Sequence, residues 1–487
     1  MSSRLNQPTA AGPPADHTAG ELTRGLGLLA GISINIANVI GTGVFLKTRV
    51  MTCNVDGPWW VMAVWLAAGL LSLAGAFCYA ELAAMLPAAG GDYLFLRRAY
   101  GRLTSFLYGW TVFAIMKTGS QAALSVAFAI FMNVALGGAL DATWFTLPLG
   151  DGVAISGLAT TALVALWTVT LFNTASVATT GNAATVLTIV KVAMVLAVGL
   201  GAFLFGPGDA AHFGMSGAAG TCEGVAASAR GGLAGFGAAM LGALWAYDGW
   251  NNVAPLCGEV KDPQRNLPRM FLWGTLLVIL LYLGVNAAYF WVLAPADIAS
   301  VSATSSVAAT AMATFAGPLA VTFIAAALML SSLGSLHASV LANSRVPFAM
   351  ARDGLFFHSL GTLSPRTRVP VRAVLAQSAW ASVLTLSGTY DTLTDSVVFA
   401  SCLFYAMSAG AVLVFRRTEP DLPRPFRTWG YPWVPLAFIV VSAGLLANAL
   451  YATPRQALTG VGVILLGLPL YAYWSRQLAA APAVTTP

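Results

Sequence analysis

Long apolar segments alternate with short polar ones along the chain, and this pattern predicts membrane-spanning helices. A helix needs about 20 apolar residues to cross the hydrocarbon core of a bilayer. Apolar runs bounded by Pro, Gly and charged residues predict twelve spans, at 26–46, 60–84, 102–136, 154–172, 183–206, 232–256, 267–294, 318–348, 370–388, 393–415, 431–452 and 456–475. These runs are too long and too continuously apolar for the alternating strands of an outer-membrane barrel. The pattern therefore predicts an all-α integral membrane protein.

The composition excludes the soluble classes of protein. Hydrophobic residues make up 58% of the 487 residues and charged residues 9%, and the mean hydropathy is +0.77. An ordinary soluble domain has about 25% charged residues, and a disordered chain lacks apolar residues. The net charge of +6 does not indicate nucleic-acid binding, because its charges lie in short loops and not on one face.

The distribution of Lys and Arg predicts the orientation. Twelve spans place both termini on one side, which we take as the cytoplasm. Four of the 24 basic residues then lie outside, namely Lys47, Arg49, Arg230 and Arg455. Lys117 and Lys191 lie within spans, and the other 18 lie inside. This bias follows the positive-inside rule, so we expect a multi-pass protein of the cell inner membrane with both termini cytoplasmic.

The segments outside the spans are short. Residues 1–25 are rich in Pro, Ala, Gly and Thr, which is typical of a disordered cytoplasmic tail and not of a signal peptide. A second short tail is expected at 479–487. The longest loop, 207–231, is too short to form a soluble domain.

Five cysteines are present. Cys78, Cys257 and Cys402 lie in or at the ends of spans, where packing is the expected role. Cys53 and Cys222 fall in two outward loops, where an oxidising periplasm permits a disulfide. The sequence leaves open whether these two are bonded.

The first span contains Gly41-Thr42-Gly43 in mid-membrane. Each Gly costs about 1 kcal/mol against Ala in a helix, and unwound backbone at this depth must line a cavity or be buried in protein. Unwinding would free the amides of these three residues at a helix start, which attracts carboxylates. Close packing of helices through small residues is the alternative.

The sixth span repeats this feature, with Gly249 beside polar residues in Trp245-Ala246-Tyr247-Asp248-Gly249-Trp250-Asn251-Asn252. Broken spans that lie five apart fit two inverted five-helix repeats, which hold a substrate near the membrane midplane. Free carbonyls of Val39, Ile40 and the sixth span would accept from an ammonium group. Amides on one side and carbonyls on the other predict a site for a zwitterion.

Several motifs resemble one known family. They are Gly41-Thr42-Gly43, the run from Trp245 to Asn251, Glu259-Val260-Lys261-Asp262-Pro263-Gln264-Arg265-Asn266-Leu267-Pro268, Tyr79-Ala80-Glu81-Leu82, Pro87-Ala88-Ala89-Gly90-Gly91-Asp92-Tyr93, Ser344-Arg345 and Ala351-Arg352-Asp353-Gly354. Together they resemble the amino acid–polyamine–organocation superfamily, and within it the L-type amino-acid transporter family, whose members include light chains of heteromeric exchangers. The likeness covers roughly residues 20–420.

The resemblance implies a leucine-transporter-like fold. Its two inverted repeats would be 26–206 and 232–415, joined by an extracellular loop at 207–231 and followed by two further helices in 416–478.

The resemblance also implies a substrate site. The carboxylate would bind at Gly41, Thr42 and Gly43, and the α-amine at carbonyls of Val39, Trp245 and Ala246. Trp245 would close over the substrate as an outward gate, although a large ring at this place is equally a good core residue.

Asp248 and Lys191 are charges within spans, which by default mark function. Asp248 caps the freed amides of span six or serves as the counter-charge for a basic side chain. Family members with a small residue here prefer neutral amino acids, and an exchanger of cystine and cationic amino acids has Asp. The resemblance therefore predicts cationic substrates alongside neutral ones.

Lys191 lies about ten residues from either end of span five, too deep to reach the surface. A buried ammonium could carry a proton or act as a fixed cation. In relatives a lysine here occupies the place of sodium in sodium-coupled members, which implies sodium-independent transport. The expected partners are the Gly41 region and Ser331 or Ser332.

Other polar residues in spans leave their roles open. Lys117 bonds carbonyls within the bundle or lines the pathway, and Asn38 points into the pocket. Asn251 joins neighbouring helices through hydrogen bonds or orients the unwound segment. Glu81 is expected to pair with Arg97 or Arg98. The imidazole of His337 is expected to find its hydrogen-bond partners within the helix bundle.

The favoured function is a sodium-independent amino-acid exchanger that works by alternating access. A proton-coupled symporter of neutral amino acids or polyamines is the alternative. A membrane enzyme lacks a nucleophile–base pair or metal cluster in the sequence, and a channel lacks a filter-like repeat. No cofactor or metal is expected.

The expected partners are small amino acids and the lipid bilayer. Heteromeric family members use a cysteine between spans three and four to join a heavy chain, and residues 137–153 contain none. We therefore expect no disulfide-linked heavy chain, and a monomer or weak homodimer.

Overall fold

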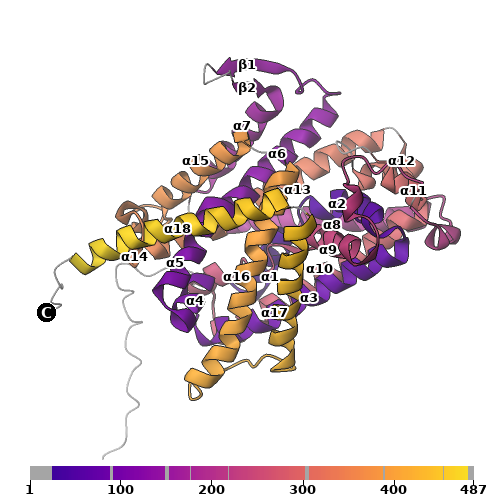
Figure 1. The fold of residues 1–487 in the computed structure, drawn as a ribbon. Coiled ribbons are helices and arrows are strands. Elements are labelled where there is room, and N and C mark those ends of the chain that lie inside the picture. Colours follow the sequence, from indigo (N-terminus) through magenta and orange to yellow (C-terminus); the bar gives the residue numbers. More distant parts are fainter. Residues whose placement is uncertain are drawn as a thin grey trace, which may run out of the picture.

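The protein is a bundle of helices with one small β-hairpin at its edge (Figure 1). The computed structural model describes residues 25–87, 91–147, 153–175, 177–217, 219–301, 306–317, 319–387, 390–452 and 454–480. The predicted tails at 1–25 and 479–487 lie outside the described residues, apart from residues 25, 479 and 480.

Within these ranges, seven helical segments are long and apolar enough to cross a membrane. Five are single helices: α3 (Pro58–Met85), α10 (Pro263–Val292), α16 (Tyr390–Thr418), α17 (Trp433–Ala452) and α18 (Pro454–Ala480). The other two join consecutive helices: α5 (Arg102–Thr111) continues through the π-helix η1 (Val112–Met116) into α6 (Lys117–Ala135), and α13 (Leu319–Asn343) into α14 (Arg345–Arg352). The chain is thus a mostly helical, multi-pass membrane protein.

Further apolar helices complete the bundle. They are α7 (Gly157–Phe172), α8 (Val177–Phe205), α9 (Gly232–Tyr247), α12 (Val307–Ala316) and α15 (Val371–Ser387). An eighth membrane-length segment is the pair α1 (Leu28–Val39) and α2 (Gly43–Val55), which meet at 43°. Each of the twelve predicted apolar runs overlaps one of these helices or pairs, because long apolar runs form the helices and Gly and Pro residues lie between them.

Several of the described elements are absent from the predicted pattern, among them α12, which lies between the seventh and eighth predicted spans. The strands β1 (Thr143–Leu147) and β2 (Val153–Ser156) pair antiparallel and project beyond the helices at the top of Figure 1. The short helices α4 (Asp92–Tyr100) and α11 (Pro295–Ala299) lie in predicted loops. The first span also extends further than predicted, since α2 continues to Val55.

Two glycines let the interrupted helices approach closely. A Cβ on Gly43 would lie 2.5 Å from the Cα of Ala246, so α2 and α9 touch through backbone. Gly249 has φ of +108°, a region that favours glycine, and a Cβ there would lie 2.8 Å from the Asn38 carbonyl oxygen. Glycine is therefore required at both positions by packing.

The residues of several sequence motifs pair with one another at one end of the bundle. Arg345 donates to Glu259 in a fully buried ion pair of 3.2 Å. The Tyr93 hydroxyl donates to Asp353 at 2.8 Å. Burial and the Asp353 carboxylate raise the pKa of the Tyr93 phenol well above its usual range, so this donor stays protonated.

Glu81 does not pair with Arg97 or Arg98 as predicted. Its carboxylate accepts two bonds from Arg416, of 3.0 and 2.8 Å, while Arg97 pairs with Asp353 and Arg98 with Glu419. Arg416 lies 335 residues further along the chain, so the helix packing, which the sequence pattern does not specify, determines the partner.

Cys53, at the end of α2, and Cys222, in the loop before α9, are joined by a disulfide. Their Cα atoms lie 5.6 Å apart, within the range of such bonds, and the bond closes a loop of 169 residues. The bond holds the long loop against α2. Cys78, Cys257 and Cys402 are free and buried.

The contact between α2 and α9 predicts different effects for two neighbouring glycines. Gly43→Ala forces a Cβ against the backbone of Ala246, and such overpacking costs about 1–3 kcal/mol. Gly41→Ala is the matched control, since its Cβ would meet Ser335 Oγ at an ordinary 3.4 Å. We expect the thermal unfolding midpoint in detergent to fall for Gly43→Ala and to change much less for Gly41→Ala. Equal midpoints would contradict this packing.

The disulfide predicts a redox-dependent stability. Breaking a bond that closes a long loop removes about 2–4 kcal/mol of stability. We expect Cys222→Ser, or reduction of the wild type, to lower the unfolding midpoint, and reduction to have no further effect on Cys222→Ser. A wild-type midpoint that is insensitive to reductant would show that Cys53 and Cys222 are not bonded.

Candidate functional site

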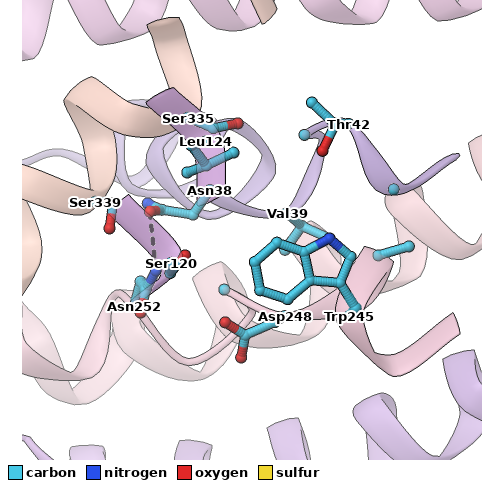
Figure 2. A pocket seen from close by; sticks show the side chains of 14 residues that line it. Asn38, Val39, Thr42, Ser120, Leu124, Trp245, Asp248, Asn252, Ser335 and Ser339 are labelled. Carbon is cyan, nitrogen blue, oxygen red and sulfur yellow. Dashed lines mark hydrogen bonds between the residues drawn. The ribbon is translucent and has the colours of Figure 1, made fainter. Parts of the chain in front are cut away.

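A small central cavity lies where α1 and α2 meet the end of α9. Its walls come from α1, α6, α9 and α13, and include Asn38, Val39, Thr42, Ser120, Leu124, Trp245, Asp248, Asn252, Ser335 and Ser339 (Figure 2). Short polar side chains and backbone dominate the lining, so the cavity suits a small, polar ligand.

One side of the cavity is the start of α2. Gly41, Thr42 and Gly43 all line it, and α2 begins at Gly43. The first amides of a helix have no partner within the helix, and the helix dipole adds partial positive charge there. This end of the cavity can therefore bind a carboxylate.

The other side presents the last carbonyls of α1 and α9, and protein donors already contact the predicted acceptors. The Tyr282 hydroxyl, on α10, lies 2.9 Å from the Val39 oxygen and 3.0 Å from the Ala246 oxygen. The Trp245 carbonyl accepts from the Asp248 amide. A carbonyl has two lone pairs, so Val39 and Ala246 keep capacity for a ligand amine.

Lys191, on α8, is the cation that holds the break in the first span. Its ammonium donates to the carbonyls of Ala37 and Ile40, both at 2.7 Å, and to Ser335 Oγ at 2.6 Å. The residue is 1% exposed. Three acceptors satisfy the three N–H groups of an ammonium, so the lysine ties α8 to both α1 and α13.

The predicted serine partners of Lys191 are one helical turn away from the observed one. Ser335 bonds the lysine, whereas Ser332 donates to the Leu328 carbonyl of its own helix and Ser331 Oγ is buried without a hydrogen-bond partner. Ser331 and Ser335 are four residues apart and so share a helix face. The prediction therefore identified the correct helix but placed the contact one turn too early along it.

Asp248 follows the last residue of α9 and is paired with protein groups. Its Oδ2 lies 3.4 Å from Lys117 Nζ, and its Oδ1 accepts from the Tyr405 hydroxyl at 2.8 Å. The Tyr405 hydroxyl is also 3.2 Å from Asn251 Oδ1. Asp248 and Lys117, both singled out in the sequence, are thus one ion pair that joins the sixth span to α6 and α16.

Trp245 lines the cavity and is 7% exposed. Figure 2 shows its indole between Thr42 and Asp248 in this view. Asn252 donates to Asn38 Oδ1 at 2.9 Å, which links α1 to the segment after α9 on the opposite side of the cavity. His337, outside the cavity, bonds Asn173 at 2.9 Å and is satisfied within the bundle.

Sequence reasoning missed Tyr282, Tyr405 and Ser335. The two tyrosines stand in long apolar spans, where an aromatic residue is the ordinary choice for packing, and nothing in the local pattern marks them. Ser335 belongs to a run of small polar residues with Ser331 and Ser332. Searching one face of that helix at intervals of four would have included it.

The described residues contain no group of three or more His, Cys, Asp or Glu side chains placed to hold a metal ion. The chemistry of the central cavity is that of amides, carbonyls, hydroxyls and one ion pair.

Comparisons with known proteins identify the family of the chain. A model of the family described as amino acid permease matches residues 26–473. The chain is 28% identical to b(0,+)-type amino acid transporter 1 of Mus musculus, over 92% of this chain and 88% of that protein. It is 29% identical to the serine/threonine exchanger SteT of Bacillus subtilis, over 94% and 98%.

The chain is also 27% identical to the human large neutral amino acids transporter small subunit 2, over 96% of this chain and 84% of that protein. These relatives are transporters and exchangers, not enzymes. The chain belongs to the amino acid permease family, within the amino acid–polyamine–organocation superfamily.

Proposed function

We propose that this protein is a sodium-independent exchanger of amino acids. The position of the Lys191 ammonium carries the proposal. Two backbone carbonyls and a hydroxyl at 2.6–2.7 Å are oxygen ligands of the kind that a cation binds, and a covalently held cation already occupies them. A transporter with its own ammonium at this point needs no sodium ion there.

The proposed substrates are cationic and/or neutral L-amino acids. The amides at Gly41, Thr42 and Gly43 would take the carboxylate, and the carbonyls of Val39 and Ala246 the ammonium group. The relatives support this class, since their names describe transport of neutral amino acids or serine/threonine exchange. Trp245 is the proposed outward gate, because its ring borders the cavity beside both interrupted spans.

The proposed architecture has twelve spans in a five-plus-five inverted repeat. Eight membrane-length segments and the shorter helices α7, α8, α9 and α15 supply that number. The repeats are 26–206 and 232–415, with the interrupted spans first in each, and α17 and α18 follow. The proposed orientation has both termini in the cytoplasm of a cell with an inner membrane, and the bias of Lys and Arg toward that side supports it.

We propose that no heavy chain is linked by a disulfide. Residues 137–153 contain no cysteine, Cys53 and Cys222 are bonded to each other, and the other three cysteines are buried. The protein then works as a monomer or weak homodimer.

Exchange is tested with purified protein in liposomes preloaded with unlabelled amino acid. We expect labelled leucine and serine to enter only against internal amino acid, and replacing sodium by choline to change the rate less than twofold. A proton-coupled symporter would instead accumulate substrate in empty liposomes under a pH gradient. Uptake that requires sodium, or that proceeds into empty liposomes, would contradict the proposed exchanger.

Lys191→Met tests the role of the internal cation. The change removes the ammonium from the buried carbonyls of Ala37 and Ile40 and leaves the single Ser335 hydroxyl to serve both. A buried carbonyl without a donor costs about 1–3 kcal/mol. We expect exchange to fall at least tenfold, whereas Lys261→Met, at an exposed position, is the matched control and should keep the wild-type rate. Wild-type exchange by Lys191→Met would show that the ammonium is not needed.

A further inference from the structure

Among the residues that the structure describes, Asp248 is the one charged residue that lines the central cavity, and it also lines a second small cavity. This side cavity lies between α3, α9, α16 and α17. Its walls are mostly apolar, with Leu71, Trp250 and Phe438 among them. A carboxylate at the boundary of both cavities meets any side chain that extends from the substrate site in this direction.

The charge of Asp248 is already balanced by the protein. The Lys117 side chain is 3% exposed and lines neither cavity, and its ammonium lies 3.4 Å from Asp248 Oδ2. The lysine reaches this point because it is the first residue after the π-helix η1, where its own amide donates to the Val112 carbonyl five residues back. Such π-turns change the helix register and often occur at functional sites.

The ion pair is long and can be exchanged. Its 3.4 Å separation exceeds the 2.7–2.9 Å typical of strong ammonium–carboxylate bonds. Lys117 has a second set of contacts on Tyr405, whose hydroxyl is 3.3 Å away and whose ring centre is 6.0 Å away. A flexible ammonium can therefore leave Asp248 and keep a hydrogen bond and a cation–π contact.

We infer that Lys117 sets the substrate's charge preference by acting as an internal counter-ion of Asp248. This inference rests on the proposed amino-acid exchange. With the pair closed, both cavities present a neutralised wall, which suits neutral side chains. A cationic side chain binds Asp248 only by displacing the Lys117 ammonium to Tyr405, so cationic amino acids bind in competition with the protein's own lysine.

The test measures labelled arginine and leucine counter-flow in liposomes and reports their ratio. Lys117→Met leaves the Asp248 carboxylate without a protein cation, so we expect the arginine-to-leucine ratio to rise at least tenfold. Lys117→Arg keeps the charge and should keep the ratio within about threefold. An unchanged or lower ratio for Lys117→Met, in liposomes that still exchange leucine, overturns the inference and leaves the exchange function standing.

A charge-balanced double variant covers the case in which Lys117→Met does not fold. Asp248→Asn alone leaves Lys117 as an unpaired buried cation, and we expect exchange of both substrates to fall, arginine more than leucine. Lys117→Met with Asp248→Asn removes both charges and should regain leucine exchange at least fivefold over Asp248→Asn. Failure of the double variant to regain leucine exchange, with protein amounts equal by immunoblot, also overturns the inference. Absence of any exchange by the wild type would instead refute the proposed function.

Discussion

A polar backbone group in the middle of a membrane must have a partner, and the break between α1 and α2 leaves several without one. The protein meets this constraint with an ammonium on α8 and a hydroxyl on α13, which together satisfy the carbonyls of Ala37 and Ile40. The groups left over face the central cavity. The same break thus requires Lys191 for its stability and provides the amides that make a site.

The two sides of the cavity are not equivalent. On the carbonyl side, Tyr282 bridges the ends of α1 and α9, and Asn252 bonds Asn38, so the interrupted spans are held together by protein groups. On the amide side, Gly41 and Gly43 bring the start of α2 directly to the cavity. A carrier that alternates between two states must break and re-form contacts. The hydrogen bonds of Tyr282 and Asn252 are contacts that can break and re-form.

The sequence predicted the apolar helices and the interruption at Gly41, and it singled out Asp248 and Lys191, because apolar length, mid-span glycine and intramembrane charge are strong local signals. It did not predict partners. Glu81 pairs with Arg416 and not Arg97, and Lys191 with Ser335 and not its neighbours, because pairing depends on helix register and packing between distant segments. The tyrosines of the site have no local signature at all.

The central claim is that the junction of interrupted helices binds the zwitterionic part of an amino acid without sodium. Thermal unfolding of the purified protein in sodium-free buffer, with one amino acid, its amide and its N-acetyl derivative at equal concentration, tests this most directly. We predict that the free amino acid raises the unfolding midpoint and that neither derivative does, since each lacks one of the two charges. Equal stabilisation by either derivative, or stabilisation by the amino acid only with sodium, would contradict the account.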